Sequence, residues 1–259
     1  MAPTNQLSSI VLHFETDQVR RLALEEVNLS EPAEGIRWLH LAGDVGRSRE
    51  WLQNNSPLDS THIEALCKEL TRPRLFVDSD KNIMLTLRTA RTTADLPLDY
   101  MSLRVWASGK QLISVSLKTT DIVDDFIAHS HSQRKSVVST EQLLLELSQF
   151  ITAEFTGQVH DLDEEINALE YDWEENQSVD IGELVSVRQK VSRISRYLSP
   201  QLEAVQKTEQ LIAEQDLPKA MKKRYHDGWR EVVNRVRRDL EALAEMRERV
   251  TILSDTLQQ

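Results

Sequence analysis

The 259 residues carry 42 acidic and 31 basic side chains, a formal net charge of −11, and 40% of them are hydrophobic. This composition is typical of a globular protein, and the single cysteine, Cys67, excludes an internal disulfide and fits a reducing compartment. The N-terminus lacks the pattern of a signal peptide, and no window approaches the roughly 20 apolar residues of a membrane-spanning helix.

The first 135 residues are predicted to alternate between strands and helices. Short apolar or alternating runs bounded by turn residues predict strands at residues 9–14, 21–24, 36–41, 75–77 and 83–87. Apolar spacing predicts helices at residues 47–54 and 60–70, after the third of these strands. We expect Asp59 to cap the second helix, with Ile63, Leu66 and Cys67 buried.

A β-hairpin is predicted next. Residues 101–106 alternate with period two, a turn follows at 108–110, and the chain returns as residues 112–117. A helix at residues 120–128 closes this half. We therefore predict an α+β fold whose body is an α/β/α sandwich with a mixed sheet, with a domain boundary at 135/136.

Residues 136–259 contain only helix signals. Ser139 and Gln142 have capping-box spacing, and the helix that they open is predicted to reach residue 176. After a polar turn the chain reverses direction, and a second helix, with an apolar face that begins at Leu184, is predicted to run back along the first. Pro200 is expected to break or kink that helix, and Ser199 to cap its continuation. Two long antiparallel helices therefore precede a third.

The third helix is predicted to follow Asp216, a suitable cap, and to run from residue 219 to Gln259. At about 1.5 Å per residue it would be roughly 60 Å long, so we expect it to leave the globular body as a stalk. The apolar residues on one side of this helix, which we call its seam, are alternately four and three positions apart. Arg247 and Ser254 occupy two positions of this seam. Because no stop signal precedes Gln259, we expect the chain to be cut within a helix that continues.

Charge is distributed unevenly along the helical half. Residues 136–183 hold 13 Asp and Glu and no Lys or Arg, whereas residues 184–259 hold 15 Lys and Arg against 11 acids. The simplest interpretation is that acidic and basic segments pair as neighbouring helices. The alternative is that the acidic segment concentrates cations, with Glu170, Asp172, Glu174 and Glu175 at its turn as candidates.

We find no motif for catalysis, so we predict that the protein is not an enzyme and binds no covalent cofactor. Cys67 and His62 are five residues apart and do not share a helix face, so they do not form a nucleophile and base. His160 and Glu164 are the best local metal pair, but two ligands make at most a weak site, and we favour ordinary solvated surface positions for both. The basic residues between 219 and 238 are scattered over several faces, which argues against a nucleic-acid partner.

The order of several segments resembles one family. They are the step Arg72-Pro73-Arg74, the run LPLDYMSLRVW at residues 96–106, the hairpin, the run RISRYLSPQ at residues 193–201, and the long terminal helix. Together they resemble the cytoplasmic domain of CorA-type divalent-cation transporters, specifically the zinc-transporting ZntB branch. The Gly-Met-Asn signature and both membrane spans of that family would lie beyond Gln259.

The resemblance implies a homopentameric funnel at the cytoplasmic side of a bacterial inner membrane, with Zn²⁺ or a similar divalent cation as cargo. Candidates for the axis-facing side of the stalk are Arg247, Val250, Ser254 and Leu257. The main alternative is a soluble coiled-coil adaptor with an α/β head. A small-molecule enzyme would need a pocket containing perturbed titratable groups.

Overall fold

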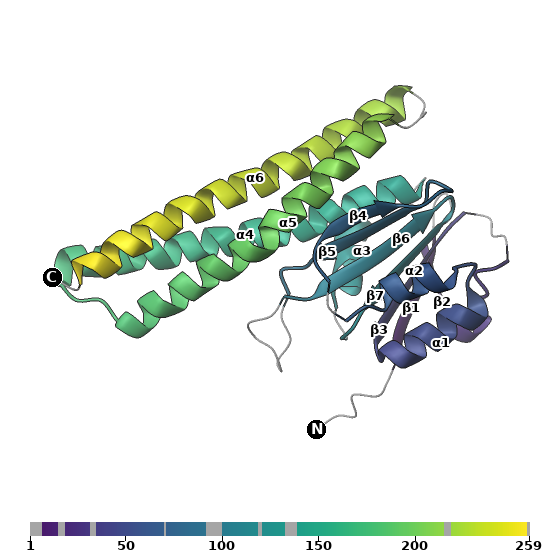
Figure 1. Cartoon of the computed structure of the whole chain (residues 1–259), viewed down its shortest axis with the longest axis horizontal. Coiled ribbons are helices and arrows are strands. Elements are labelled where there is room, and N and C mark those ends of the chain that lie inside the picture. The colour runs from purple at the N-terminus through teal and green to yellow at the C-terminus, as the bar shows by residue number, and fades with distance from the viewer. Residues whose placement is uncertain are drawn as a thin grey trace. The chain divides into compact units, whose positions relative to one another are not determined.

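The computed structural model describes residues 7–14, 19–31, 35–69, 71–91, 100–118, 121–132, 139–214 and 219–257 (Figure 1). The chain forms two compact units, Met1–Phe150 and Ile151–Gln259, which we call the sheet unit and the helical unit. The division lies 15 residues beyond the predicted boundary at 135/136, because the first turns of α4 (Thr140–Asn176) pack on the sheet unit. The expected cap Asp216, the expected helix start at residue 120 and the last residue, Gln259, lie outside the described residues.

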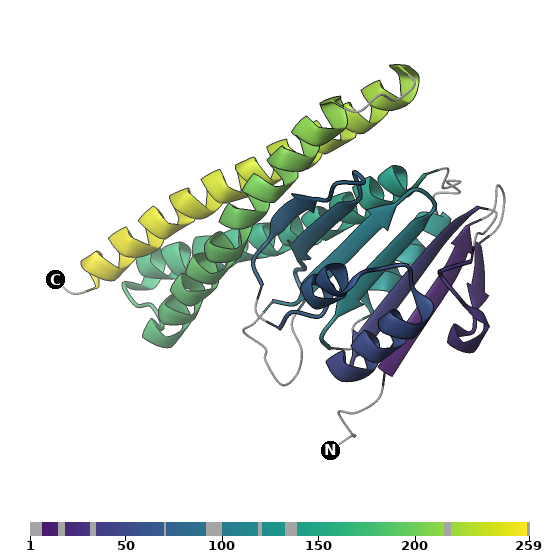
Figure 2. The ribbon, with the colours of Figure 1, turned by 45° about the vertical axis from the view of Figure 1, so that its right-hand side comes forward.

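The sheet unit is built on a seven-stranded mixed sheet in the order β2-β1-β3-β7-β6-β5-β4 (Figure 2). Its strands are β1 (Leu7–Phe14), β2 (Val19–Leu22), β3 (Ile36–Gly43), β4 (Arg74–Val77), β5 (Ile83–Arg88), β6 (Ser102–Ser108) and β7 (Gln111–Ser116). The central pair β3 and β7 is parallel, and the other neighbours are antiparallel. The central strands are buried along nearly their whole length, as expected for a sheet covered on both faces.

Two short helices, α1 (Val45–Asn55) and α2 (Ser60–Leu66), cover one face of this sheet (Figure 1). The predicted cap of α2 is confirmed, because the backbone N–H of His62 donates to the Asp59 carboxylate at 2.9 Å. Leu66 and Cys67 are buried against strand residues that include Trp106. A short 3-10 turn, η1 (Leu24–Glu26), precedes β3.

Aromatic side chains fill the opposite face, where α3 (Ile122–Ser132) and the start of α4 pack. Trp38 of β3 meets Phe126 of α3 edge to face at 5.6 Å, and Phe126 meets Phe150 of α4 in the same way at 5.7 Å. The predicted cap of α4 is present, because Gln142 N–H donates to Ser139 Oγ at 3.1 Å. The predicted α/β/α sandwich with a mixed sheet is therefore confirmed.

The predicted hairpin is also present. Ser108 pairs with Gln111 at the end of β6 and β7, and Gly109 has φ of +49°, a conformation that favours glycine. This turn fixes which residues of β6 and β7 lie opposite each other.

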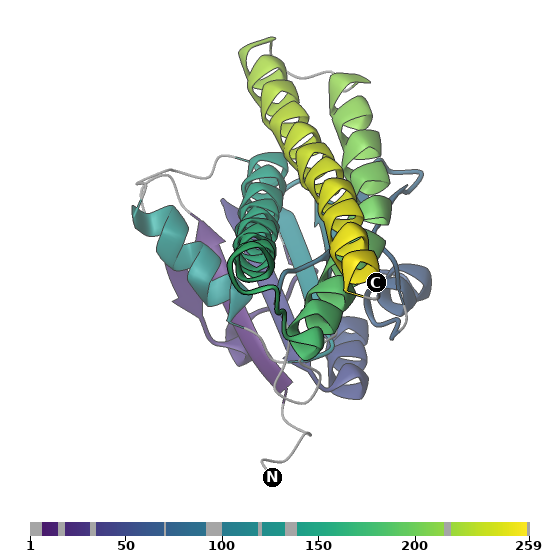
Figure 3. The same ribbon diagram turned by 90° about the vertical axis from the view of Figure 1, so that its left-hand side faces the viewer.

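The helical unit consists of α4 from Ile151 onward, α5 (Ile181–Glu214) and α6 (Lys219–Thr256), side by side with α5 antiparallel to both neighbours (Figure 3). The apolar faces predicted for α4 and α5 are buried, with Phe155 and Leu198 both at 0% exposure. The long third helix thus packs along α4 and α5 of its own chain, where we had expected a stalk that leaves the body.

Pro200 does not break α5, so the expected break is wrong. The helix continues from Ile181 to Glu214 with Pro200 inside it. Ser199 caps no second helix; its hydroxyl donates to the backbone oxygen of Ser195 at 2.8 Å.

The predicted seam of α6 is buried at Trp229, Val233, Val236, Leu243 and Val250, but not at Leu240, Arg247 or Ser254. Leu240 is half-buried, and Asp239 before it is buried. The buried positions beyond Leu243 are Met246, Val250 and Leu253, whereas Arg247 is exposed and Ser254 is half-buried. A straight helix with 3.6 residues per turn drifts from a strict heptad, which explains the slip. Within the chain, the buried positions of the seam are therefore apolar from Leu243 to Leu253.

Candidate functional site

A charged cluster joins α4 and α6 in the helical unit, and Arg249 is its centre. The guanidinium donates to Glu170 at 2.9 and 2.5 Å, to Asp163 at 2.7 Å and to Asn167 at 2.6 Å. All three acceptors lie on α4 at helical spacing, so that one turn after another presents an oxygen to the same arginine. The hydrogen bonds to Glu170 raise the pKa of Arg249 above its usual range, although its burial opposes this.

A cavity of about 320 Å³ adjoins this cluster between α4 and α6. Val159, Ala242 and Met246 form its apolar wall, while His160, Asp163, Glu245 and Arg249 line its polar side. The cavity is therefore polar where charges from the acidic and basic helices meet.

Asp239 also lines this cavity and is a buried carboxylate, only 5% exposed. Its Oδ2 accepts a hydrogen bond from the Thr156 hydroxyl at 2.9 Å. Burial raises the pKa of Asp239, while the Thr156 hydroxyl and the charges of Arg235 and Arg238 oppose that rise. Asp239 therefore takes up a proton more readily than an exposed aspartate would.

The metal pair proposed from the sequence, His160 and Glu164, lies on the exposed side of α4. Among the residues that the structure describes, no three His, Cys, Asp or Glu side chains come close enough to hold a metal ion. His160 and Glu164 therefore lack a third protein ligand within this part of the chain.

The four acidic candidates at the end of α4 differ from one another. Glu170 is half-buried and forms an ion pair with Arg249, whereas Asp172, Glu174 and Glu175 are exposed. Only these three exposed carboxylates are accessible to cations in solution, so the hypothesis that the turn attracts cations now rests on them.

The axis candidates on α6 differ in the same way. Val250 is 2% exposed and lies inside the helical unit, whereas Ser254 and Leu257 are half-buried and Arg247 is exposed. Arg247 is thus the candidate whose side chain is most accessible to another molecule. That any of them faces an assembly axis stays a prediction.

The pairing of acidic and basic helices is confirmed. Besides the Arg249 cluster, Lys190 of α5 contacts Glu165 of α4 at 2.7 Å.

The sequence analysis did not identify Arg249 or Asp239 as members of a site. The signal for Asp239 was its position three residues after Val236 and four before Leu243, within the apolar seam. Nothing in the local sequence marked Arg249.

The cysteine and histidines show no nucleophilic arrangement among the described residues. Burial raises the pKa of the Cys67 thiol, which keeps it protonated. His62 does not contact Cys67 as a base would; it lies between two carboxylates, 2.8 Å from Asp59 and 2.9 Å from Asp78.

None of the helices that the structure describes is both long enough and apolar enough to cross a membrane.

Comparison with known families decides which proteins this chain is related to. The family model described as "CorA-like Mg2+ transporter protein" matches residues 33–259. The chain belongs to this family.

Two CorA-like relatives have named activities. The chain is 26% identical over 231 residues to the divalent cation transporter CmaX of Pseudomonas aeruginosa, covering 86% of this chain and 66% of CmaX. It is 26% identical over 232 residues to the zinc transport protein ZntB of Pectobacterium carotovorum, covering 89% of this chain and 68% of that protein. The chain thus spans about two thirds of the length of these relatives.

Solved structures of the CorA-like family share the fold. The full-length CmaX structure superposes with a TM-score of 0.82 at 25% identity and covers 96% of this chain and 76% of CmaX. The cytoplasmic domain of ZntB from Vibrio parahaemolyticus superposes with a TM-score of 0.76 at 18% identity and covers 96% of both chains. The chain therefore has the fold of a CorA-like cytoplasmic domain over nearly its whole length.

Proposed function

We propose that this chain is the cytoplasmic part of a longer membrane transporter of divalent cations, and that zinc is the first cation to test. The observation that carries the proposal is the CorA-like family match over residues 33–259. The names of CmaX and ZntB support a divalent cation, and zinc in particular, as cargo. Both relatives are transporters, which supports a role without covalent chemistry.

The assembly that we propose is a homopentameric funnel beneath the inner membrane of a bacterium. Arg247 is our candidate for contact with neighbouring copies, because it is exposed while its neighbour Met246 is buried inside the chain. Five copies of an exposed arginine around an axis would repel cations unless acids or anions screen them. In this proposal the chain shapes the electric field along the ion route.

The proposed function can be tested in cells that lack the gene. We expect the full-length gene to restore the accumulation or tolerance of Zn²⁺ or another divalent cation, measured as metal content per cell. A gene truncated after Gln259 serves as the control, because its described helices contain no membrane-spanning candidate. Metal contents identical to those of the empty vector, with the full-length protein present in the membrane, would contradict the proposal.

The exposed acids at the end of α4 provide a sharper test of field shaping. Replacing Asp172, Glu174 and Glu175 together by Asn or Gln should slow transport at low metal concentration and leave it unchanged at saturating metal, because the acids raise the local cation concentration. The effect should shrink as ionic strength rises. Replacing Glu170 is a separate experiment, since it also removes the partner of Arg249. Unchanged transport by the triple variant at low metal and low salt would remove this role.

A further inference from the structure

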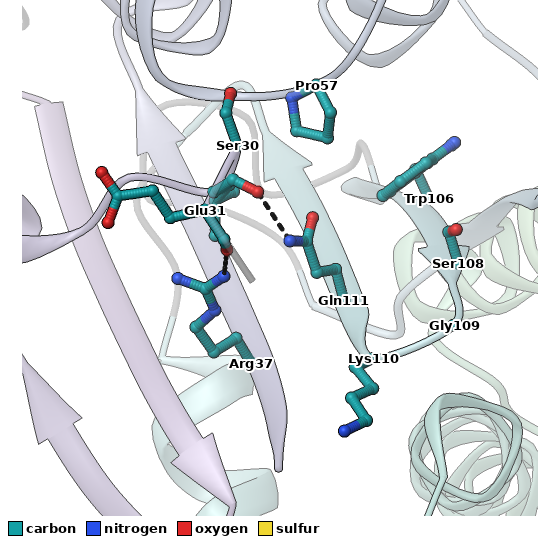
Figure 4. Close-up of a pocket in the computed structure, with 10 residues that line it drawn as sticks. Ser30, Glu31, Arg37, Pro57, Trp106, Ser108, Gly109, Lys110 and Gln111 are labelled. Atoms are coloured by element: carbon teal, nitrogen blue, oxygen red, sulfur yellow. Dashed lines mark hydrogen bonds between the residues drawn. The ribbon is translucent and has the colours of Figure 1, made fainter. Parts of the chain in front are cut away.

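The hollow at the turn between β6 and β7 is held together by the chain's own hydrogen bonds (Figure 4). Its volume is about 500 Å³. Gln111 Nε2 donates to the backbone oxygen of Leu29 at 2.6 Å. The guanidinium of Arg37 donates to the backbone oxygens of Asn28 and Glu31. The polar side chains of this hollow thus fasten its own wall, whereas an outer strand of the same sheet leaves its hydrogen-bonding groups open.

That outer strand is β4, which forms one edge of the sheet and pairs with β5 (Figure 1). Just after it, the backbone N–H of Asp78 donates to the oxygen of Asn82 at 3.2 Å. In an antiparallel pair every second residue bonds to the partner strand, so the residues two and four positions before Asp78 also bond to β5. Leu75 and Val77 therefore turn their N–H and C=O groups outward. Among the residues that the structure describes, these groups have no hydrogen-bond partner.

The side chains at every second position along this edge are exposed. They are Arg72, just before the strand, then Arg74 and Phe76. Phe76 is 52% exposed and pairs with Met84 of β5, which places its ring on the face that α1 and α2 cover. Neither arginine forms an ion pair with another residue that the structure describes. An aromatic ring and two cations thus line an open edge.

The sequence of this edge is self-complementary. It reads RPRLFVDSD at residues 72–80, with two basic residues before Phe76 and two acidic residues after it at the same distances. In two antiparallel copies centred on Phe76, Leu75 of one copy faces Val77 of the other. The outward groups then form four hydrogen bonds, because each of the two facing pairs exchanges two. Pro73 has no N–H and ends the ladder.

Opposite charges also face each other in this register. Arg72 of one copy comes opposite Asp80 of the second copy, and both side chains are exposed. Arg74 comes opposite Asp78, whose side chain is 11% exposed and already contacts His62, so Arg74 adds attraction without a direct ion pair. Charged edge residues usually keep sheets apart, but opposite charges across a strand pair are favourable. A parallel pair in register would set like charges opposite each other.

We propose that β4 is the interaction surface for β4 of a second copy of this chain, through which two sheets join edge to edge in antiparallel orientation. The two Phe76 rings lie side by side on one face, where they remove apolar surface from water. A contact of this kind is two-fold, so it cannot join neighbours around a five-fold axis and instead links chains of two assemblies. The proposal therefore stands apart from the proposed transport function.

Disulfide crosslinking of the 259-residue chain tests this register directly. Phe76→Cys places two cysteines in a facing pair with Cα atoms about 4.5 Å apart, a distance at which disulfides form. The matched control is Gln53→Cys, at an exposed position on α1. Native Cys67 is buried and does not compete. Under mild oxidation we expect at least fivefold more disulfide dimer from Phe76→Cys than from the control. Equal yields would overturn the proposal and leave the edge to a different partner.

Charge variants of the Phe76→Cys chain test what holds the two copies together. Arg72→Glu should lower the yield of disulfide dimer at least threefold, because it sets an acid opposite Asp80 of the second copy. Arg47→Glu makes the same charge change at an exposed position of α1 and should leave the yield unchanged. Adding Asp80→Arg to Arg72→Glu should restore the yield. Equal effects of Arg72→Glu and Arg47→Glu would contradict the proposed register.

Discussion

The two units of the chain differ in where their charged side chains lie and in which groups they contact. The sheet unit buries Arg104 to 1% exposure, and its guanidinium donates to backbone oxygens, including those of Lys68 at 2.5 Å and Glu69 at 3.2 Å. Burial is the main cause that lowers the pKa of Arg104 to about 10. Apart from the buried Asp239, the helical unit instead keeps the charged side chains described above at or near the surface and pairs them between helices, as at Arg249.

This difference teaches where each unit can tolerate change. A buried charge held by carbonyl oxygens is tied to one backbone arrangement, because every partner is part of the main chain. A surface pair between helices contributes less to stability and is sensitive to salt. We therefore expect the substitution of a buried charge in the sheet unit to be strongly destabilising. The helical unit, in contrast, can use its surface charges to interact with ions or with other copies of the chain.

The largest effect should come from the buried arginine. Arg104→Ala should lower the free energy of unfolding by about 3–5 kcal/mol, because it leaves both a cavity and backbone oxygens without donors. Arg104→Met fills most of the space and should cost less, which separates the packing effect from the lost hydrogen bonds. Chemical denaturation of the sheet unit measures both. A loss below about 0.5 kcal/mol for Arg104→Ala would refute the idea that the buried charge is tied to the fold.

An intermediate effect should come from acid. His40 is buried beside the Ser114 hydroxyl, 2.8 Å away, and burial lowers its pKa from 6.5 to about 4. The unfolded chain therefore binds a proton more readily than the folded chain, so stability is full above pH 6.5 and is lost as pH falls toward 4. The loss should be about 2 kcal/mol at pH 5.

Thermal unfolding at pH 7 and pH 5 measures this effect. His40→Gln should weaken the dependence on pH, whereas His160→Gln, at an exposed position of the helical unit, should leave it intact. The same pH dependence in the native chain and in His40→Gln would assign the acid sensitivity to other groups.

The smallest effect should come from the paired surface arginine. Arg249→Gln should destabilise the helical unit by about 1–2 kcal/mol, because Glu170 and Asp163 lose a partly buried partner. Arg247→Gln, two residues away and exposed, should change stability by less than about 0.5 kcal/mol. Urea denaturation at low and high salt compares the two variants. Equal effects of the two substitutions would show that the cluster on α4 adds nothing.

Much of the fold could be predicted from the sequence because its signals are local. Period-two runs placed the strands, and Asp59 and Ser139 capped the helices that they were expected to open. The errors arose where position along a long helix matters. Proline at position 200 is accommodated within α5, and a small mismatch between 3.6 and 3.5 residues per turn moved Arg247 out of the seam of α6.

The sites were harder to predict, because they depend on which residues of distant segments lie opposite one another. Arg249 meets Glu170 across 79 positions in the chain, and Gln111 meets Leu29 across 82. The acidic turn was visible as composition, but only the register between α4 and α6 shows that Glu170 is already paired. Composition alone cannot separate a paired carboxylate from an exposed one.

The most direct test of the proposed function is ion flux through the full-length protein in lipid vesicles loaded with a zinc-sensitive dye. We predict Zn²⁺ entry well above that of empty vesicles, and slower entry at low Zn²⁺ for the triple variant of Asp172, Glu174 and Glu175. A second set of vesicles, loaded with a magnesium-sensitive dye, measures Mg²⁺ entry. Folded, membrane-inserted protein that passes neither Zn²⁺ nor Mg²⁺ above the background of empty vesicles would contradict the proposed function.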